Sequence, residues 1–148
     1  MDRFDLEREY RLVEDEYNKA KATAAGFRGE YKRKCDICIG YVGLAVIMVM
    51  FYYLTIIFPS NYGPPIIAPI IIVMRFVYWA IGAIYVIFLL KKIYNVYLEG
   101  YSPRARKLAE RSKRIPLTQK AEKYDEEASK YENRLNEIQE LMLENEMK

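Results

Sequence analysis

The sequence predicts an all-α membrane protein, in which a two-span transmembrane helical hairpin carries cytosolic coiled-coil helices at its N- and C-terminal ends. Three observations predict this fold class. Charge is segregated, because 29% of the 148 residues are charged but only Asp36 and Arg75 carry charge between residues 36 and 90. That interval holds two apolar segments, each longer than the ~20 residues that a bilayer-spanning helix needs. Heptad repeats of apolar residues lie on both sides of it.

The first expected element is a cytosolic coiled-coil helix over residues 1–34. Its apolar residues recur at alternating spacings of four and three, as in a coiled-coil helix. Because the chain opens with the charged stretch MDRFDLEREY and not with a signal peptide, the first apolar segment is expected to act as its own insertion signal. We call this repeat the N-terminal seam, and it consists of Leu6, Tyr10, Val13, Tyr17, Ala20, Ala24, Phe27 and Tyr31.

Two transmembrane helices are expected next, over residues 36–58 and 66–90. With a rise of ~1.5 Å per residue, each would cross a hydrocarbon core of ~30 Å. The uncharged connection 59–65 contains three prolines and a glycine. Pro59 is expected to end the first helix, and two consecutive prolines are expected to begin the second. The two spans then form a hairpin with a short non-cytosolic loop.

The basic residues predict the orientation of this hairpin. Lysine and arginine gather on the cytosolic side of membrane proteins. The connection 59–65 has no basic residue, so both termini are expected to be cytosolic. The basic residues before the first span are Arg28, Lys32, Arg33 and Lys34, and those after the second are Lys91, Lys92, Arg104, Arg106 and Lys107.

Residues 91–116 are expected to form a basic segment at the membrane surface. The serine–proline pair at 102–103 is typical of a helix start, and Pro116 forces a break. With Ala105 and Leu108 on one side, the segment is interpreted as a short helix lying against anionic headgroups. The alternative is a solvated juxtamembrane linker. The expected contacts with anionic lipid are Arg104, Arg106, Lys107, Arg111, Lys113 and Arg114.

Residues 117–148 are expected to form a second coiled-coil helix. Seams rich in tyrosine and alanine favour large-into-small packing between different helices over a parallel leucine zipper. The two terminal helices run in opposite directions and could pair with each other, although both are acidic toward their free ends, which opposes that pairing. Self-association between copies, or contact with other membrane subunits, stays equally open. The C-terminal seam is Leu117, Ala121, Tyr124, Ala128, Tyr131, Leu135, Ile138 and Met142, and the interface residues expected from both seams are Tyr10, Val13, Tyr17, Phe27, Tyr124, Tyr131, Leu135 and Ile138.

Arg75 stands alone inside the second apolar segment. A charged side chain there costs a few to many kcal/mol, and the first segment offers no carboxylate at matching depth because Asp36 lies at its cytosolic end. Lipid phosphate, another membrane helix or water in a pore could offset this cost. The prolines before Arg75 are expected to place the first turns outside a regular helix, nearer the headgroups. Lipid phosphate or a partner helix is the preferred interpretation.

The residue types of common enzyme chemistry are scarce. Histidine is absent, which removes the usual general base and metal ligand. Cys35 and Cys38 have C-x-x-C spacing but lack the second ligand pair or βαβ context of a zinc or redox site, so they are interpreted as small boundary residues, with reversible palmitoylation as an alternative. A net charge of +3 does not indicate nucleic acid. We expect no enzyme activity, catalytic residue, cofactor, metal, nucleic-acid partner or small-molecule substrate.

The order of these parts resembles the Lunapark family of endoplasmic-reticulum proteins. PIIIVMRFVYW in the second span is similar to that family's proline, aliphatic run and arginine, and TQKAEKYD at 118–125 resembles its Thr-Gln ahead of a Lys-Tyr step. The resemblance covers roughly residues 6–125. This sequence has no counterpart of the family's cysteine zinc finger, and Asp2 stands where some members carry a lipidated glycine.

The resemblance implies a non-enzymatic scaffold or shaping protein that stabilises junctions of the tubular endoplasmic reticulum. Two alternatives come from other classes. One is an accessory subunit of a larger membrane complex, in the mitochondrial inner membrane for example, and the other is a small homo-oligomeric channel or pore-forming effector, in the plasma membrane for example. In all three, the partners are membrane lipids with anionic headgroups and either further copies of the chain or other membrane subunits.

Overall fold

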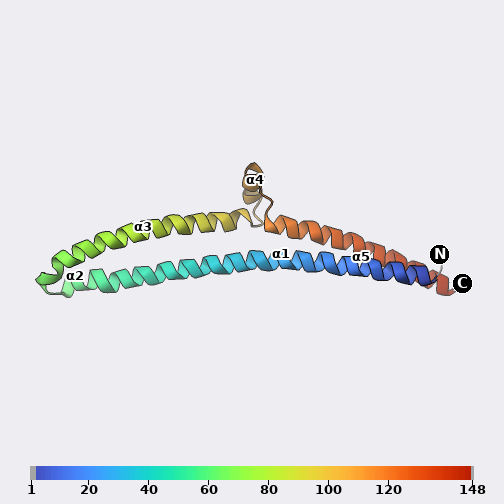
Figure 1. The fold of residues 1–148 in the computed structure, drawn as a ribbon, viewed down its shortest axis with the longest axis horizontal. Helices are drawn as coiled ribbons and strands as arrows, with labels where there is room; N and C mark the ends of the chain where they lie inside the picture. Colours follow the sequence, from blue (N-terminus) through green and yellow to red (C-terminus); the bar gives the residue numbers. More distant parts are fainter. Residues whose placement is uncertain (1–2, 148) are drawn as a thin grey trace. The chain divides into compact units, whose positions relative to one another are not determined.

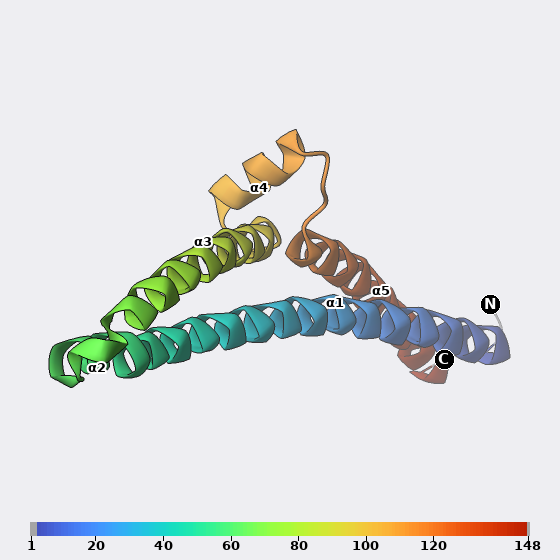
Figure 2. The same cartoon turned by 60° about the vertical axis from the view of Figure 1, so that its left-hand side comes forward.

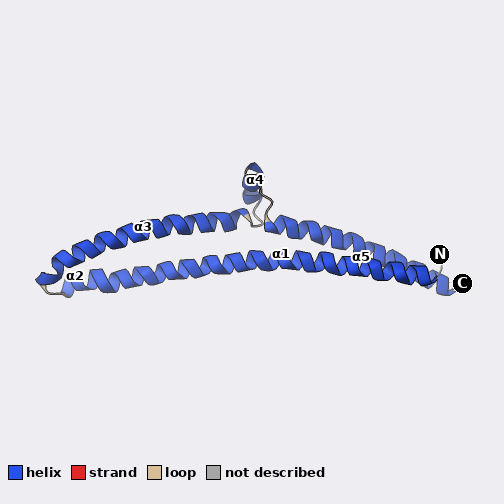
Figure 3. Ribbon diagram, viewed as in Figure 1, coloured by secondary structure: helices blue, strands red, loops and turns tan. Residues whose placement is uncertain are grey.

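The computed structural model describes residues 3–147, and helices joined by short connections account for nearly all of them (Figure 1). The described part of the chain contains no strand (Figure 3). The elements in chain order are α1 (Arg3–Tyr52), the π-helix η1 (Tyr53–Ile57), α2 (Phe58–Tyr62), the 3₁₀ helix η2 (Pro65–Ile67), α3 (Ala68–Leu98), α4 (Pro103–Arg111) and α5 (Leu117–Met147).

The chain divides into two compact units. The hairpin unit comprises residues 33–97, and the helix-pair unit comprises residues 1–32 together with 98–148. The long helices α1 and α3 each contribute to both units, because no helix breaker interrupts α1 where residues 1–34 were predicted to end, and α3 continues past Leu90 to Leu98. The predicted basic segment 91–116 therefore begins as helix.

The sequence predicted that Pro59 ends the first apolar helix, but the helical path continues through Pro59. α1 passes into η1 and then into α2, whose first turn contains Pro59, and the helical path ends at Tyr62. Proline lacks an N–H and its ring clashes with the carbonyl four residues earlier, but the wider π-helical turn before it relieves that clash. The non-helical connection is thus reduced to Gly63 and Pro64.

The second apolar helix begins as predicted, with irregular geometry at its prolines. Pro64 is extended, residues Pro65–Ile67 form the 3₁₀ helix η2, and the regular helix starts at Ala68. Proline suits the first turn of a helix because its missing N–H would have no intrahelical partner there. Arg75 therefore follows the start of the regular helix closely, in agreement with the expected irregular first turns.

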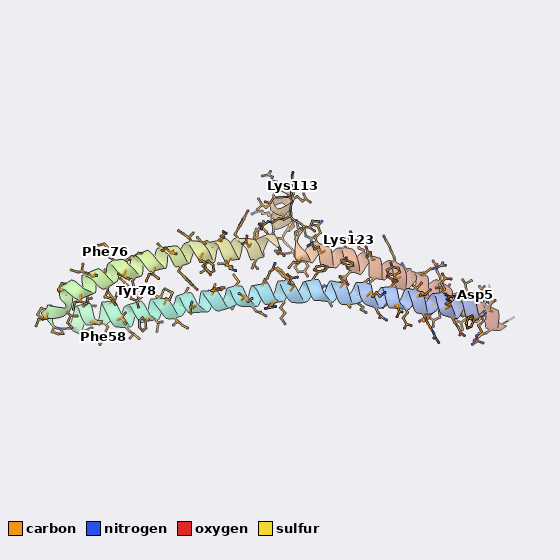
Figure 4. The ribbon with its side chains drawn as sticks, in the orientation of Figure 1. Asp5, Phe58, Phe76, Tyr78, Lys113 and Lys123 are labelled. Atoms are coloured by element: carbon orange, nitrogen blue, oxygen red, sulfur yellow. The ribbon has the colours of Figure 1, made fainter. Side chains whose placement is uncertain are left out.

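Aromatic side chains hold the two helices of the hairpin unit together in antiparallel register. The ring of Tyr78 packs edge-on against Tyr52, with ring centres 5.5 Å apart, and Phe88 packs against Tyr41 at 5.4 Å. The Tyr85 hydroxyl donates a hydrogen bond of 2.6 Å to the carbonyl of Tyr41. In Figure 4, Tyr78 lies between the ribbons of α1 and α3, whereas Phe76 projects away from them.

The helix-pair unit is built from α5 and the N-terminal part of α1, which run antiparallel side by side (Figure 2). Phe27 stacks on Tyr124 with ring centres 5.8 Å apart, and Arg3 near the start of α1 forms an ion pair with Glu146 near the end of α5. The Thr118 hydroxyl lies 3.0 Å from the Glu99 carbonyl oxygen and ties the start of α5 to the end of α3.

The short helix α4 ends at Arg111, five residues before the break predicted at Pro116. The N–H groups of Lys113 and Arg114 bond to the carbonyls of Glu110 and Ala109 at 3.0 and 2.9 Å. These two bonds form a Schellman motif, which closes the helix by itself. Its left-handed position is occupied by Lys113, with φ of 53°, where glycine is usual.

Candidate functional site

Between residues 37 and 90 the surface of the hairpin unit is largely apolar, and Arg75 is its only charged residue. Large hydrophobic side chains point away from the protein, including Ile66, Phe76 and Ile84 with 84%, 73% and 71% of their areas exposed. Only 6% of the most apolar 18-residue window is buried in each of its two long helices. Both helices are long and apolar enough to cross a membrane.

Arg75 is an exposed cation on this apolar surface. It lies seven residues after Ala68, the start of α3, which is a rise of ~10 Å along the helix. Within residues 3–147, no carboxylate lies within 4 Å of its guanidinium and no hydrogen bond links it to another residue. The hairpin thus leaves the charge of Arg75 to be met from outside the described chain.

The basic segment forms a stripe on the outer face of α4. Arg104, Lys107 and Arg111 recur at spacings of three and four, which places them on one face of the helix, and all three are exposed. Lys113 and Arg114 follow in the connection and are exposed too. We call these five residues the basic stripe.

Two parts of the predicted lipid-contacting helix need correction. Arg106 turns toward α5 and forms an ion pair of 2.6 Å with Glu122, so the guanidinium of Arg106 is engaged within the protein. Ala105 is fully buried, as is Ala109 one turn later. The small side chains of α4 pack against the protein instead of facing the lipid, because helix-pair packing covers them. The interaction left for a membrane is electrostatic.

The helix-pair unit brings the two predicted seams together within one chain. Every position of both seams is buried or half-buried, whereas their neighbours on the other faces are almost all exposed. Ala24 and Ala121 are covered almost completely, with 0% and 1% exposed. Small residues on both helices let the backbones approach closely, and the larger rings pack around them. The predicted interface residues that become half-buried or buried here are Tyr10, Val13, Tyr17, Phe27, Tyr124, Tyr131, Leu135 and Ile138.

The sequence suggested that the acidic free ends of the two helices would oppose their pairing. Ion pairs between the helices offset part of this negative charge. Arg134 of α5 donates hydrogen bonds of 2.8 Å to Glu9 and 2.9 Å to Glu137. These carboxylates raise the pKa of Arg134 above its usual value, with the bond to Glu9 as the main cause. Arg28 and Asp125 form a further pair. All of these side chains are at least partly exposed to solvent, so each pair contributes little stability.

Sequence reasoning missed the functional position of Thr118. Its side chain is 1% exposed, and its hydroxyl can share its proton between the carbonyls of Glu99 at 3.0 Å and Gly100 at 3.1 Å. The available signal was a small polar residue two positions after a proline, in the first turn of a predicted helix. Such hydroxyls commonly bond to backbone groups at helix starts.

Cys35 and Cys38 are free thiols and half-buried.

Comparisons with models of protein families, with curated proteins and with solved structures give no match to this chain. The structure itself defines the class of protein: it is a helical protein with two helices that are long and apolar enough to cross a membrane. Its described surface offers three candidate sites: the apolar hairpin with Arg75, the basic stripe and the helix pair.

Proposed function

We propose that the chain is a non-enzymatic membrane scaffold that inserts its hairpin unit into a bilayer and keeps both termini in the cytosol. One observation carries this proposal. The two apolar helices are only 6% buried over their most apolar windows, so the protein does not cover its own hydrophobic surface. In water such a surface would be highly unfavourable, and a bilayer core removes it from water.

The position of Arg75 supports the same placement. From Ala68 to Leu90, α3 measures ~34 Å, which is slightly longer than a hydrocarbon core of ~30 Å. The start of α3 then projects to the non-cytosolic boundary, and Arg75 lies ~10 Å from that start. Arginine near a helix end extends its head toward the interface. The charge is met by lipid headgroups at a lower cost than at the bilayer centre.

The basic stripe gives the cytosolic side its own affinity for membranes. Five exposed cations, Arg104, Lys107, Arg111, Lys113 and Arg114, lie on the surface of the helix-pair unit. Each basic residue near an anionic surface contributes about 1 kcal/mol, and the attraction fades within a Debye length. A hairpin inserted from one side, with a headgroup-binding helix on that same side, occupies more of the cytosolic leaflet and favours curvature.

The finer proposal is that this scaffold stabilises junctions of endoplasmic-reticulum tubules, as the resemblance to the Lunapark family implies. The helix-pair unit supports a spacer role, because two long helices pack against each other within one chain through contacts such as that of Phe27 with Tyr124. An accessory subunit of a larger membrane complex is the alternative proposal, in which a neighbour's carboxylate meets Arg75. The third is an oligomeric pore lined by Arg75.

Topology is the decisive measurement for the proposal. In a chain with Cys35 and Cys38 replaced by serine, Tyr62→Cys places a thiol at the end of the hairpin and Ser112→Cys places one beside the basic stripe. In sealed vesicles with the cytosolic face outward, a membrane-impermeant maleimide should label Ser112→Cys at once. It should label Tyr62→Cys only after detergent is added. Immediate labelling of both thiols would overturn the inserted hairpin.

Reconstitution separates the scaffold from its two rivals. The purified full chain in anionic liposomes should change vesicle diameter, measured by electron microscopy, without conducting ions. Arg104→Gln combined with Lys107→Gln and Arg111→Gln should weaken that change. An anion conductance that reverses its preference in Arg75→Glu would instead establish the pore, and a chain that stays inserted but leaves vesicles unchanged would favour the accessory subunit.

A further inference from the structure

An apolar groove runs between α1 and α3 in the hairpin unit. Its volume of about 530 Å³ falls in the range of ~300–1,000 Å³ typical of small-molecule sites. Gly82 and Ala83 stand among larger side chains in its lining, and a Cβ added at Gly82 would meet no atom within 4 Å. It is lined by Met48, Val49, Tyr52, Tyr78, Trp79, Gly82, Ala83, Val86 and Ile87.

Arg75 lies on the same face of α3 as this groove. Arg75, Trp79, Gly82 and Val86 recur at spacings of four, three and four, so they share one side of the helix. The last three line the groove. Arg75 precedes Trp79 by one turn, ~6 Å along the axis. Arg75 therefore stands one turn beyond the end of the groove that lies nearer the hairpin connection, as Lys91 does beyond Ile87 at the other end.

We propose that this groove and Arg75 together bind one anionic phospholipid, with the phosphate on the guanidinium and one acyl chain in the groove. The inference rests on the proposed insertion of the hairpin unit and gives its lipid contact a defined site. Guanidinium groups bind phosphate oxygens through two parallel hydrogen bonds, which a planar fork of donors permits. The apolar lining matches an acyl chain in the same way that it matches the bilayer.

The direction of the site agrees with that of a lipid in the non-cytosolic leaflet. Arg75 lies nearer the hairpin connection at Gly63, and the groove extends from Trp79 toward Ile87, away from the connection. A lipid of that leaflet has its phosphate at the non-cytosolic boundary and its chains pointing toward the bilayer centre. The headgroup and the tail thus meet the residues that suit them.

Charge decides between this lipid and a second copy of the hairpin. Between residues 37 and 90 the sequence contains no aspartate or glutamate. A second hairpin packed into the groove would bring no carboxylate to Arg75. For the same reason, residues 37–90 offer no carboxylate to the quaternary ammonium group of a zwitterionic phosphatidylcholine headgroup. A phospholipid with a net negative headgroup is the occupant that neutralises the site.

Native mass spectrometry of the full chain in detergent tests this assignment. Phosphatidylglycerol and phosphatidylcholine with identical chains would be supplied at equal concentration. The parent should retain one phosphatidylglycerol with a preference of about tenfold, the scale of a hydrogen-bonded charge pair. Arg75→Gln should reduce the preference to about one. Gly82→Leu should lower retention of both lipids, because the new side chain fills the groove.

Gly43→Leu is the matched control. A Cβ at Gly82 or at Gly43 meets nothing within 4 Å, so either helix accepts a side chain there, but Gly43 does not line the groove. Gly43→Leu should bind lipid like the parent. Helix content from circular dichroism would verify that each variant is folded, and Arg75→Lys, which keeps the charge, should retain part of the preference.

Three results would overturn the assignment. They are equal retention of the two lipids by the parent, an unchanged preference in Arg75→Gln, or a dimer that Gly82→Leu dissociates without any effect on lipid. The thiol-labelling topology is measured on the same preparations before extraction. If Tyr62→Cys is protected but the lipids are not distinguished, only the lipid site fails. If Tyr62→Cys is labelled from the cytosolic side, the proposed function fails as well.

Discussion

Ala24 offers the sharpest test of the helix pair. Its side chain is 0% exposed, and it belongs to a seam whose small residues let α1 and α5 approach closely. Ala24→Leu adds three carbon atoms where neighbouring side chains already fill the space around Ala24. Such overpacking costs about 1–3 kcal/mol, which raises the opening equilibrium of the helix pair by roughly 5- to 150-fold. The change of helix propensity from alanine to leucine is small by comparison.

Amide hydrogen exchange on the reconstituted full chain measures that equilibrium, because exchange of the α5 amides requires opening of the pair. Ala25→Leu is the control, since Ala25 is exposed on the same helix. We expect faster exchange in α5 for Ala24→Leu and parent-like exchange for Ala25→Leu. Equal exchange in both variants would refute the packing. Exchange that slows when the protein is concentrated would show that the seams pair between chains.

Three further predictions concern the helix-pair unit. Thr118→Val should lower the free energy of unfolding by about 1–3 kcal/mol, because it leaves buried carbonyls without the hydroxyl donor. Thr23 is exposed on α1, and Thr23→Val should change the free energy of unfolding by less than ~0.5 kcal/mol. Amide exchange rates of both variants measure these changes. Lys113→Gly should stabilise the end of α4 by about 1 kcal/mol, since glycine has no penalty at positive φ, and should weaken binding to anionic vesicles in a sedimentation assay. Arg134→Gln should change the free energy of unfolding little, because its ion pairs are exposed to solvent, and a double-mutant cycle with Glu9→Gln would measure the pair.

The periodic parts of the fold could be predicted from the sequence. The seams were recognisable because a spacing of four and three follows from helix geometry alone, and Leu6 and Ile138 are among the most deeply buried side chains in the structure. The two apolar helices were recognisable from length and hydropathy in the same way. Whether the seams pair within or between chains was not readable, because register depends on scattered ion pairs such as that of Arg134 with Glu9.

The local breaks in the helices were less predictable. Proline marks an interruption, but the sequence does not show whether the chain ends the helix there or absorbs the proline in a π-helical turn, as it does before Pro59. At the end of α4, Lys113 takes a position for which sequence rules expect glycine, so the Schellman motif carried no recognisable signal. The groove depends on side chains of two helices and could not be derived from either one.

Arg75 and the π-helical turn before Pro59, which interrupt two otherwise uniform apolar segments, lie at one level of the hairpin unit. Tyr78 packs against Tyr52, and in antiparallel helices the position facing Arg75 is therefore close to residue 55, inside the π-helix η1. There the N–H of Phe58 bonds to the Tyr53 carbonyl, and proline has no N–H to offer the next carbonyl. In the proposed insertion this level lies ~10 Å from the start of α3, in the non-cytosolic half of a ~30 Å core. A guanidinium and an irregular backbone turn at that depth can both reach headgroups and water, whereas at the bilayer centre each would be costly.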